Sequence, residues 1–332
     1  ANNPNLKRLP QNIGQPETLQ IVSLANNRLL DIPDSIGDYN HITELNVEGN
    51  QLTQLPSTIS NLIELQALNL SNNPYSSLPP EVGTLSNLRS LTLHHLPNLK
   101  ALPIFSNPKT LERLSILDCP NLTEITEDIL LASKLVELKI QATGIERLPS
   151  QLLSLPRLHD VKIRMNPNLR ELPSDIGHND ALRILSMDQN NIYIIPEDLG
   201  LLNSLETLSL DENKIVTLPS AICSLPRLEK LSLSDNQISH LCDNLAALQK
   251  LRMLNINSNP IHTLPPSIGE LQTLEHINLW DVPLLTEPTP LYELTNLQVL
   301  CLNPADYYPS PQIIRNIIKN IPSRVDILTT DG

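Results

Sequence analysis

The feature that most constrains this chain is an internal repeat of 23 or 24 residues, which recurs along nearly its whole length. Each repeat follows the pattern L-x-x-L-x-L-x-x-N-x-L-x-x-L-P, with isoleucine or valine at some leucine positions. A period of this length indicates a solenoid, in which each repeat buries its apolar side against its neighbours. The first leucine-type residue falls at Leu19, Ile42, Leu65, Leu88, Leu111, Leu135, Leu158, Leu182, Leu205, Leu228, Leu251, Leu274 and Leu297.

The letters of one repeat predict its local structure. Leu68 and Leu70 alternate with Asn69, which indicates a short strand with inward leucines and an outward asparagine. The Leu55-Pro56 pair turns the chain to the opposite side, where too few residues remain for a full α-helix. We therefore predict an α/β fold: a right-handed solenoid with a parallel β-sheet on its concave face and short 3₁₀ or extended segments on its convex face.

Asparagine recurs at the ninth position, where the chain turns inward after the strand. A buried amide there can satisfy backbone groups of its own repeat and of the next, which predicts a ladder of hydrogen bonds. Cys119 and Thr143 are smaller substitutes, whereas Leu96 and Val282 cannot form these bonds and predict locally irregular turns. The ladder asparagines are Asn27, Asn50, Asn73, Asn166, Asn190, Asn213, Asn236 and Asn259.

The stretch LQALNLSNNPYSSLPPEVGTLSNL, from Leu65 to Leu88, resembles the leucine-rich-repeat family of the 23-residue intracellular type. This class is frequent in bacterial effectors and in Ras-pathway scaffolds. The variants CPNLTEI at Cys119 and NPNLRELP at Asn166 look most like effectors of plant-pathogenic bacteria (XopL-like). The resemblance implies a non-catalytic virulence effector that is delivered by type III secretion and binds a protein in the host cytoplasm.

The repeats divide the chain into three predicted segments. Residues 1–18 match the second half of a first repeat, residues 19–302 contain thirteen strand segments, and residues 303–332 form a C-terminal cap. No strand precedes residue 5, so we expect a missing N-terminal cap and a longer parent protein, or else an open end that pairs with another chain. Apolar residues between Ile313 and Ile321, after Pro309-Ser310-Pro311, predict a short amphipathic helix, and Val325–Leu328 could add a last strand.

The formal net charge of −13 limits the classes of partner. Nucleic-acid binding depends on clustered Lys and Arg, so this acidic balance argues against it and against anionic membrane surfaces. No apolar run approaches 18 residues, and no signal peptide opens the chain. Net negative charge keeps a long solenoid soluble, and we predict a monomer.

The cysteines and histidines show no pattern that is typical of catalysis or metal binding. Cys119, Cys223, Cys242 and Cys301 are dispersed without a CxxC pair, which predicts free thiols in a reducing intracellular compartment. None of them precedes an aspartate by two residues, as in the Cys-x-Asp motif of some effector ubiquitin ligases. We predict no catalytic residue, metal or cofactor. The alternative is the substrate-recognition domain of a multidomain ubiquitin ligase whose catalytic domain lies elsewhere.

The candidate partner-binding residues lie on the concave face. An acidic band that includes Asp188 and Asp211 follows a basic band along the chain. The basic band would attract an acidic protein surface, or the two bands would only neutralise one another. Trp280, the only tryptophan, would anchor an interface or shield the turn at Val282-Pro283. The basic band comprises Arg89, Arg113, Lys139, Lys162 and Arg164.

Overall fold

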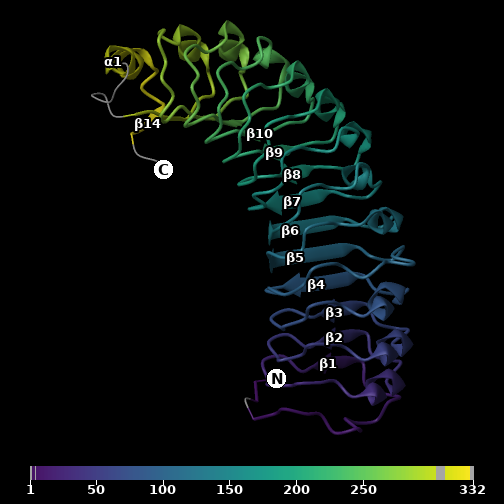
Figure 1. The fold of residues 1–332 in the computed structure, drawn as a ribbon. Coiled ribbons are helices and arrows are strands. Elements are labelled where there is room, and N and C mark those ends of the chain that lie inside the picture. The colour runs from purple at the N-terminus through teal and green to yellow at the C-terminus, as the bar shows by residue number, and fades with distance from the viewer. Residues whose placement is uncertain (1, 4, 304–310, 330–332) are drawn as a thin grey trace. The chain divides into compact units, whose positions relative to one another are not determined.

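The computed structural model describes residues 2–3, 5–303 and 311–329. The chain forms two compact units, an N-terminal unit (Ala1–Leu169) and a C-terminal unit (Arg170–Gly332). Within each unit, short parallel strands line one side, and 3₁₀ helices line the other (Figure 1). Successive strands pair in the order of the chain, one strand to a repeat. The predicted class of fold, a solenoid with a parallel sheet opposite short 3₁₀ segments, is confirmed.

The elements of the N-terminal unit repeat at the predicted period. Its strands are β1 (Ile21–Ser23), β2 (Glu44–Asn46), β3 (Ala67–Asn69), β4 (Ser90–His94), β5 (Arg113–Cys119), β6 (Glu137–Thr143) and β7 (Asp160–Arg164). Its 3₁₀ helices are η1 (Asp34–Asp38), η2 (Ser57–Asn61), η3 (Pro80–Thr84), η4 (Glu127–Leu131) and η5 (Leu152–Ser154).

The C-terminal unit continues the same order of elements. Its strands are β8 (Ile184–Ser186), β9 (Thr207–Ser209), β10 (Lys230–Ser232), β11 (Met253–Asn255), β12 (His276–Asn278), β13 (Val299–Cys301) and β14 (Asp326–Leu328). Its 3₁₀ helices are η6 (Ile176–His178), η7 (Glu197–Leu201), η8 (Ser220–Ser224), η9 (Leu245–Ala247), η10 (Pro266–Glu270) and η11 (Thr289–Glu293), and its α-helix is α1 (Pro311–Asn320).

Alternating burial along the strands builds the core of each unit. Leu68 and Leu70 are fully buried, whereas Asn69 between them is half-buried. Each buried leucine stabilises the fold by roughly 1.5–3 kcal/mol. Proline then starts the opposite side: Pro56 has φ −70° and ψ 147°, and η2 begins directly after it. Proline fixes φ near this value, so the extended entry to the 3₁₀ helix is encoded locally.

The asparagine ladder exists, but its direction differs from the prediction. The Asn50 amide donates to Val47 O in its own repeat at 2.8 Å and to Leu24 O in the preceding repeat at 3.0 Å. Its Oδ1 accepts from Leu29 N, also in the preceding repeat, at 3.0 Å. Our expectation of bonds to the next repeat is therefore wrong, because the amide contacts the residues that follow the strand of the preceding repeat.

A left-handed residue precedes the ladder position in each of the turns from Asn26 to Asp281. This eighth residue has φ between 50° and 57° where it is not glycine, and φ 66° at Gly49. His95, Ala142 and Met165 take this conformation although left-handed backbone favours glycine or asparagine. The non-glycine residues are Asn26, Asn72, His95, Asp118, Ala142, Met165, Gln189, Glu212, Asp235, Ser258 and Asp281.

Both turns that lack a polar ladder residue keep the left-handed backbone of the other turns, and only the turn at Val282 departs from them, in its hydrogen bonding. His95 before Leu96 and Asp281 before Val282 keep the left-handed conformation of the other turns. His95 N donates to Leu117 O at 2.8 Å, and Asp281 N donates to Asn303 Oδ1. These bonds to the following repeat maintain the turn without the amide.

The predicted C-terminal elements are present within the described residues. Helix α1 covers most of the apolar run that predicted it, and β14 lies within Val325–Leu328. Ile314 and Ile317 of α1 are buried and line a small cavity with Leu279, Val282 and Leu302. The parts of the predicted cap at residues 304–310 and 330–332, including Pro309-Ser310, lie outside the described residues, as do residues 1 and 4 of the first predicted segment.

The prediction of four free thiols is wrong for two of them. Cys223 and Cys242 form a disulfide with a Cα–Cα distance of 6.5 Å, whereas Cys119 and Cys301 are free. The two cysteines are 19 residues apart in sequence. The solenoid brings them together because Cys223 lies in η8 and Cys242 lies in the adjoining segment of the next repeat.

One buried tyrosine leads to a stability prediction. Tyr75 occupies a leucine position and is fully buried, and its hydroxyl has no hydrogen-bond partner among the described residues. An unsatisfied buried polar group destabilises the folded state, so we expect Tyr75→Phe to raise the free energy of unfolding by roughly 1–2 kcal/mol. The measurement is the midpoint of urea unfolding.

Tyr39→Phe is the matched control. The Tyr39 hydroxyl accepts from Ile13 N at 2.8 Å and donates to Asn12 Oδ1 at 3.0 Å, so its removal is expected to lower the midpoint. A lower midpoint for Tyr75→Phe as well would show that its hydroxyl is satisfied.

Candidate protein-binding surface

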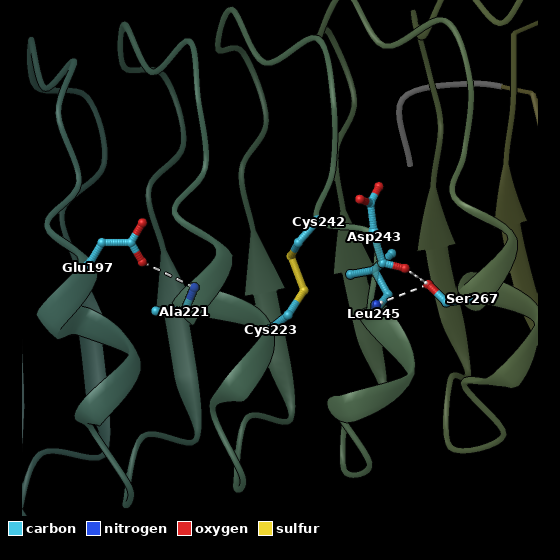
Figure 2. The surroundings of a disulfide bond; sticks show 7 residues. All are labelled: Glu197, Ala221, Cys223, Cys242, Asp243, Leu245 and Ser267. Carbon is cyan, nitrogen blue, oxygen red and sulfur yellow. Dashed lines mark hydrogen bonds between the residues drawn. A yellow bond between two sulfur atoms is a disulfide. The ribbon is translucent and has the colours of Figure 1, made fainter.

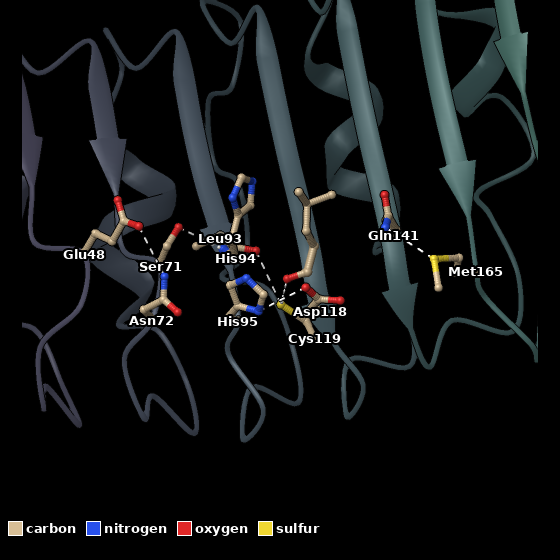
Figure 3. A network of polar contacts seen from close by, with 11 residues as sticks. Glu48, Ser71, Asn72, Leu93, His94, His95, Asp118, Cys119, Gln141 and Met165 are labelled. Atoms are coloured by element: carbon tan, nitrogen blue, oxygen red, sulfur yellow. Dashed lines mark hydrogen bonds and ion pairs between the residues drawn. The ribbon is translucent and has the colours of Figure 1, made fainter.

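The strand face is the side of each sheet formed by the outward residues at the third, fifth and seventh positions of the repeats. Along β4 and β7, half-buried outward residues alternate with buried inward ones. The polar side chains of this face contact one another across neighbouring strands of the N-terminal unit (Figure 3). Such a face offers a partner closely spaced side chains on a sheet that the core holds in place.

The basic band lies in the N-terminal unit. Ser115, Lys139 and Lys162 occupy matching positions on β5, β6 and β7, as do Gln141 and Arg164 on β6 and β7. Arg113 is exposed at the start of β5, opposite Glu137. Arg89 directly precedes β4. The structure thus places four of the predicted cations on β5, β6 and β7 and the fifth, Arg89, directly before β4 of the same unit.

Carboxylates within the band pair with three of these cations. Lys162 Nζ lies 2.8 Å from Asp160 Oδ2, and Lys139 Nζ pairs with Glu137. Arg89 pairs with Glu112 at 3.2 Å. Much of the positive charge of the basic band is therefore neutralised by these neighbouring carboxylates and not by the acidic band. A signal was available in the sequence: an acid two residues before a lysine lies on the same face of a strand.

His94 and His95 lie beside the band in a polar network (Figure 3). His94 Nε2 lies 2.7 Å from Ser115 Oγ, and His94 N donates to Ser71 Oγ at 3.0 Å. His95 Nδ1 lies 3.0 Å from Asp118 Oδ2. Burial, followed by repulsion from His95, lowers the pKa of His94 below its usual value, so His94 is neutral near pH 7.

Asp188 and Asp211 lie on the strand face of the C-terminal unit, where hydrogen bonds hold them. Asp211 accepts from Ser232 Oγ at 2.7 Å and from Ser234 N at 2.7 Å. Asp188 accepts from Ser186 Oγ at 2.6 Å and from Asp211 N at 3.2 Å. Burial raises the pKa of Asp211 above its usual value. These two aspartates belong to a serine–aspartate ladder and are not freely solvated charges.

Trp280 follows β12 in the C-terminal unit and is half-buried. Its backbone N–H donates to Asn278 Oδ1 at 3.0 Å. Leu328 on β14 pairs in register with Cys301 on β13, which in turn pairs with Asn278 on β12. Leu328 is 39% exposed. Met253, the first residue of β11, is 41% exposed but lies opposite His276 and not Trp280. We call Trp280, Cys301 and Leu328 the apolar patch; the sequence analysis singled out only Trp280 as its anchor.

The free thiols are poorly suited to nucleophilic chemistry. Burial raises the pKa of Cys119 to about 11, and its Sγ donates to Leu93 O and Leu117 O at 3.4 Å. Burial also raises the pKa of Cys301. The described residues contain no cluster of three or more His, Cys, Asp or Glu side chains suited to a metal ion. Among the same residues, no helix is long and apolar enough to cross a bilayer.

The fold and the repeated sequence define a leucine-rich-repeat solenoid, a class of protein-interaction module. Leucine-rich-repeat families are found in both units: models described as leucine-rich repeats match residues 17–75 and 250–271, and a leucine-rich-repeat region matches residues 171–260. These matches are general to the repeat and do not support the narrower XopL-like type. No curated protein matches the chain.

Solved structures of bacterial and plant proteins are similar to this chain. A leucine-rich-repeat protein of Leptospira interrogans is 29% identical, with a TM-score of 0.71 over 93% of this chain and 83% of its own. An internalin of Listeria monocytogenes is 21% identical, with a TM-score of 0.70 over 96% and 88%. The ectodomain of the Arabidopsis thaliana receptor kinase GASSHO1, solved with CASPARIAN STRIP INTEGRITY FACTOR 2, is 25% identical, with a TM-score of 0.62 over 98% and 42%.

Proposed function

We propose that this chain binds a protein partner through the strand face of its C-terminal unit, with Trp280 as the anchor. The observation that supports this proposal is the apolar patch, which places a tryptophan, a cysteine and a leucine on an otherwise polar face. Aromatic side chains at the centre of an interface contribute most to binding energy. The basic band of the N-terminal unit is proposed as a second contact region, although its internal ion pairs reduce the charge that it offers.

The test selects peptide ligands from a displayed random library on the immobilised chain and measures their affinity for variants. Trp280→Ala is expected to weaken the selected peptides at least about tenfold, which corresponds to about 1.4 kcal/mol. Tyr193→Ala is the matched control, because Tyr193 is 47% exposed and lies outside the strands. If Tyr193→Ala weakens binding and Trp280→Ala does not, the binding surface is not the strand face.

A double variant tests the basic band separately. Lys162→Glu with Arg164→Glu is expected to weaken the binding of acidic peptides severalfold, and less so at high salt, while the thermal midpoint stays near that of the parent. Unchanged binding at low salt would assign the band a structural role alone.

For the whole protein we propose a bacterial interaction protein that acts on a host. The effector function and the alternative ubiquitin-ligase function rest on the sequence resemblance. Ubiquitin transfer by the whole protein would favour the ligase, and binding without transfer would favour a scaffold. We propose that the chain folds in an oxidising compartment, because disulfides such as Cys223–Cys242 persist there. This proposal competes with the effector and ligase functions, which would place the chain in the reducing host cytoplasm.

A further inference from the structure

The disulfide joins two successive repeats on the side opposite the strands (Figure 2). Cys223 is the fourth residue of η8 and is only 4% exposed. Cys242 is half-buried and comes before η9 in the next repeat. The bond therefore fixes the position of one 3₁₀ helix against the segment that leads into the next one.

Glycine occupies the position of Cys223 in the preceding repeat, at Gly200, and in the repeat two further on, at Gly269, whereas the next repeat has Ala246. Gly200 is the fourth residue of η7, and a methyl group placed on it would lie 2.4 Å from Cβ of Ala221 and 2.5 Å from Ala221 O. Gly269 in η10 is similarly close to Pro290 O, at 2.7 Å. No side chain fits between repeats at these contacts. At Cys223 a side chain is present, so the next repeat must lie farther away.

The repeat that contains Cys242 also differs from its neighbours, in the residues that precede its 3₁₀ helix and in the length of that helix. Cys242 stands where Pro219 and Pro265 directly precede η8 and η10. Helix η9 begins two residues later than this pattern predicts and has three residues instead of five. The segment before η9 is held from the far side, where Ser267 Oγ donates to Asp243 O at 2.6 Å and accepts from Leu245 N at 3.0 Å. On the side of the preceding repeat, the disulfide links the segment before η9 covalently to η8.

A recess of about 450 Å³ opens beside the disulfide, and both cysteines line it. Its walls include Val216, Thr217 and Leu241. A disulfide that is largely covered by protein is therefore open to small molecules along one side.

We propose that Cys223–Cys242 is a thiol-exchange site, and that small dithiols reach its sulfur atoms through the recess. The thiolate of the dithiol attacks Sγ of Cys242, which is the more exposed of the two residues. The Cys223–Cys242 bond breaks, and Cys223 Sγ leaves with the electron pair and takes up a proton. The second thiolate of the reductant then attacks the mixed disulfide, which oxidises the dithiol and releases Cys242 as a thiolate that takes up a proton.

The charge of the unit sets a preference among thiols. Residues 170–332 contain ten Lys and Arg and twenty Asp and Glu, a net charge of −10. Negative charge repels anionic thiols and attracts cationic ones, and salt screens both effects. At equal thiolate concentration and low salt, cysteamine is expected to react faster than mercaptoethanesulfonate, and this difference is expected to shrink in high salt.

The test uses the full chain without denaturant. Exposed thiols are first blocked with iodoacetamide, dithiothreitol is then added, and newly formed thiols are identified by alkylation and mass spectrometry. Cys223 and Cys242 are expected to become labelled while the buried Cys119 does not. A disulfide that resists reduction until Cys119 is also labelled would overturn the proposal, because reduction would then require unfolding.

Filling the recess provides the second measurement. Thr217→Trp places a large side chain on its wall and is expected to slow reduction at least about tenfold. Thr263→Trp is the matched control, because Thr263 is exposed at the same repeat position but does not line the recess. Equal rates for both variants and the parent would overturn the entry route.

Hydrogen exchange tests the structural effect of reduction. Reduction is expected to increase exchange in residues 239–247 while β10 and β11 stay protected. The double variant Cys223→Gly with Cys242→Pro introduces the residues that Gly200 and Pro219 represent at the same repeat positions, and it is expected to be insensitive to the dithiol. Unchanged exchange in residues 239–247 after reduction of the parent would overturn the inference that the disulfide holds this boundary.

Discussion

Replacement of Asn236 by alanine is expected to lower the free energy of unfolding by about 3–5 kcal/mol, because several buried backbone groups lose their partners together. The Asn236 amide donates to Leu210 O at 2.9 Å, to Leu233 O at 3.0 Å and to Ser234 O at 3.0 Å. Its Oδ1 accepts from Ile215 N at 3.0 Å. Alanine is too short to replace any of these bonds, and the buried turn gives water little access.

The control for this prediction is Asn255→Ala on the strand face. Asn255 Nδ2 donates to Ser232 Oγ at 3.0 Å, and the side chain is half-buried, so water can replace this partner. Its loss is expected to cost less than about 1 kcal/mol. Chemical unfolding followed by circular dichroism measures both variants. Equal midpoints for the parent and Asn236→Ala would mean that the ladder contributes no net stability.

Leu208→Ala is expected to lower the free energy of unfolding by about 2–5 kcal/mol. Leu208 is fully buried at the centre of β9, in register with Leu185 on β8 and Leu231 on β10. Truncation removes apolar contacts and leaves a cavity that stacked repeats on both sides prevent from collapsing.

The neighbouring residue tests the register of the strand. Ser209 points to the opposite side of β9 and is half-buried. Ser209→Ala is expected to change the unfolding free energy by less than about 0.5 kcal/mol. A larger loss at Ser209 than at Leu208 would mean that the inward and outward positions are exchanged.

The sequence predicts the repeating parts of the fold well because the same pattern of leucine, asparagine and proline recurs in successive repeats. The alternation of Leu68, Asn69 and Leu70 is sufficient to place a strand and its buried side. Pro56 is sufficient to mark the entry to the opposite side. The period then places both features in every other repeat, so a weak local signal becomes a strong one.

Features that depend on a single repeat were harder to predict. His95 and Met165 adopt left-handed backbone although neither residue type favours it, because the fold imposes the turn that Asn26 and Gly49 encode locally. The Cys223–Cys242 disulfide depends on the contact between two repeats, which sequence spacing alone does not reveal.

The sequence predicted which residues of the candidate surface lie on neighbouring strands, but it did not predict their ion pairs or their exposure. The period correctly placed Lys139 and Lys162 side by side, but the ion pairs with Glu137 and Asp160 depend on side-chain conformations. The exposure of Leu328 depends on packing at the end of the C-terminal unit, where α1 and β14 depart from the repeat.

The backward reach of the ladder asparagines gives the stack of repeats a polarity. Ile238 N has its partner in Asn259 of the following repeat, so the turn of one repeat is completed only after the next has folded. Shortening the array from the C-terminal side leaves a buried N–H without its acceptor. Shortening it from the N-terminal side instead leaves an asparagine amide that can turn to water. Loss of a C-terminal repeat is therefore expected to destabilise the remaining array more than loss of an N-terminal repeat. During synthesis from the N-terminus, the hydrogen bonds of each turn are complete only when the following repeat has folded.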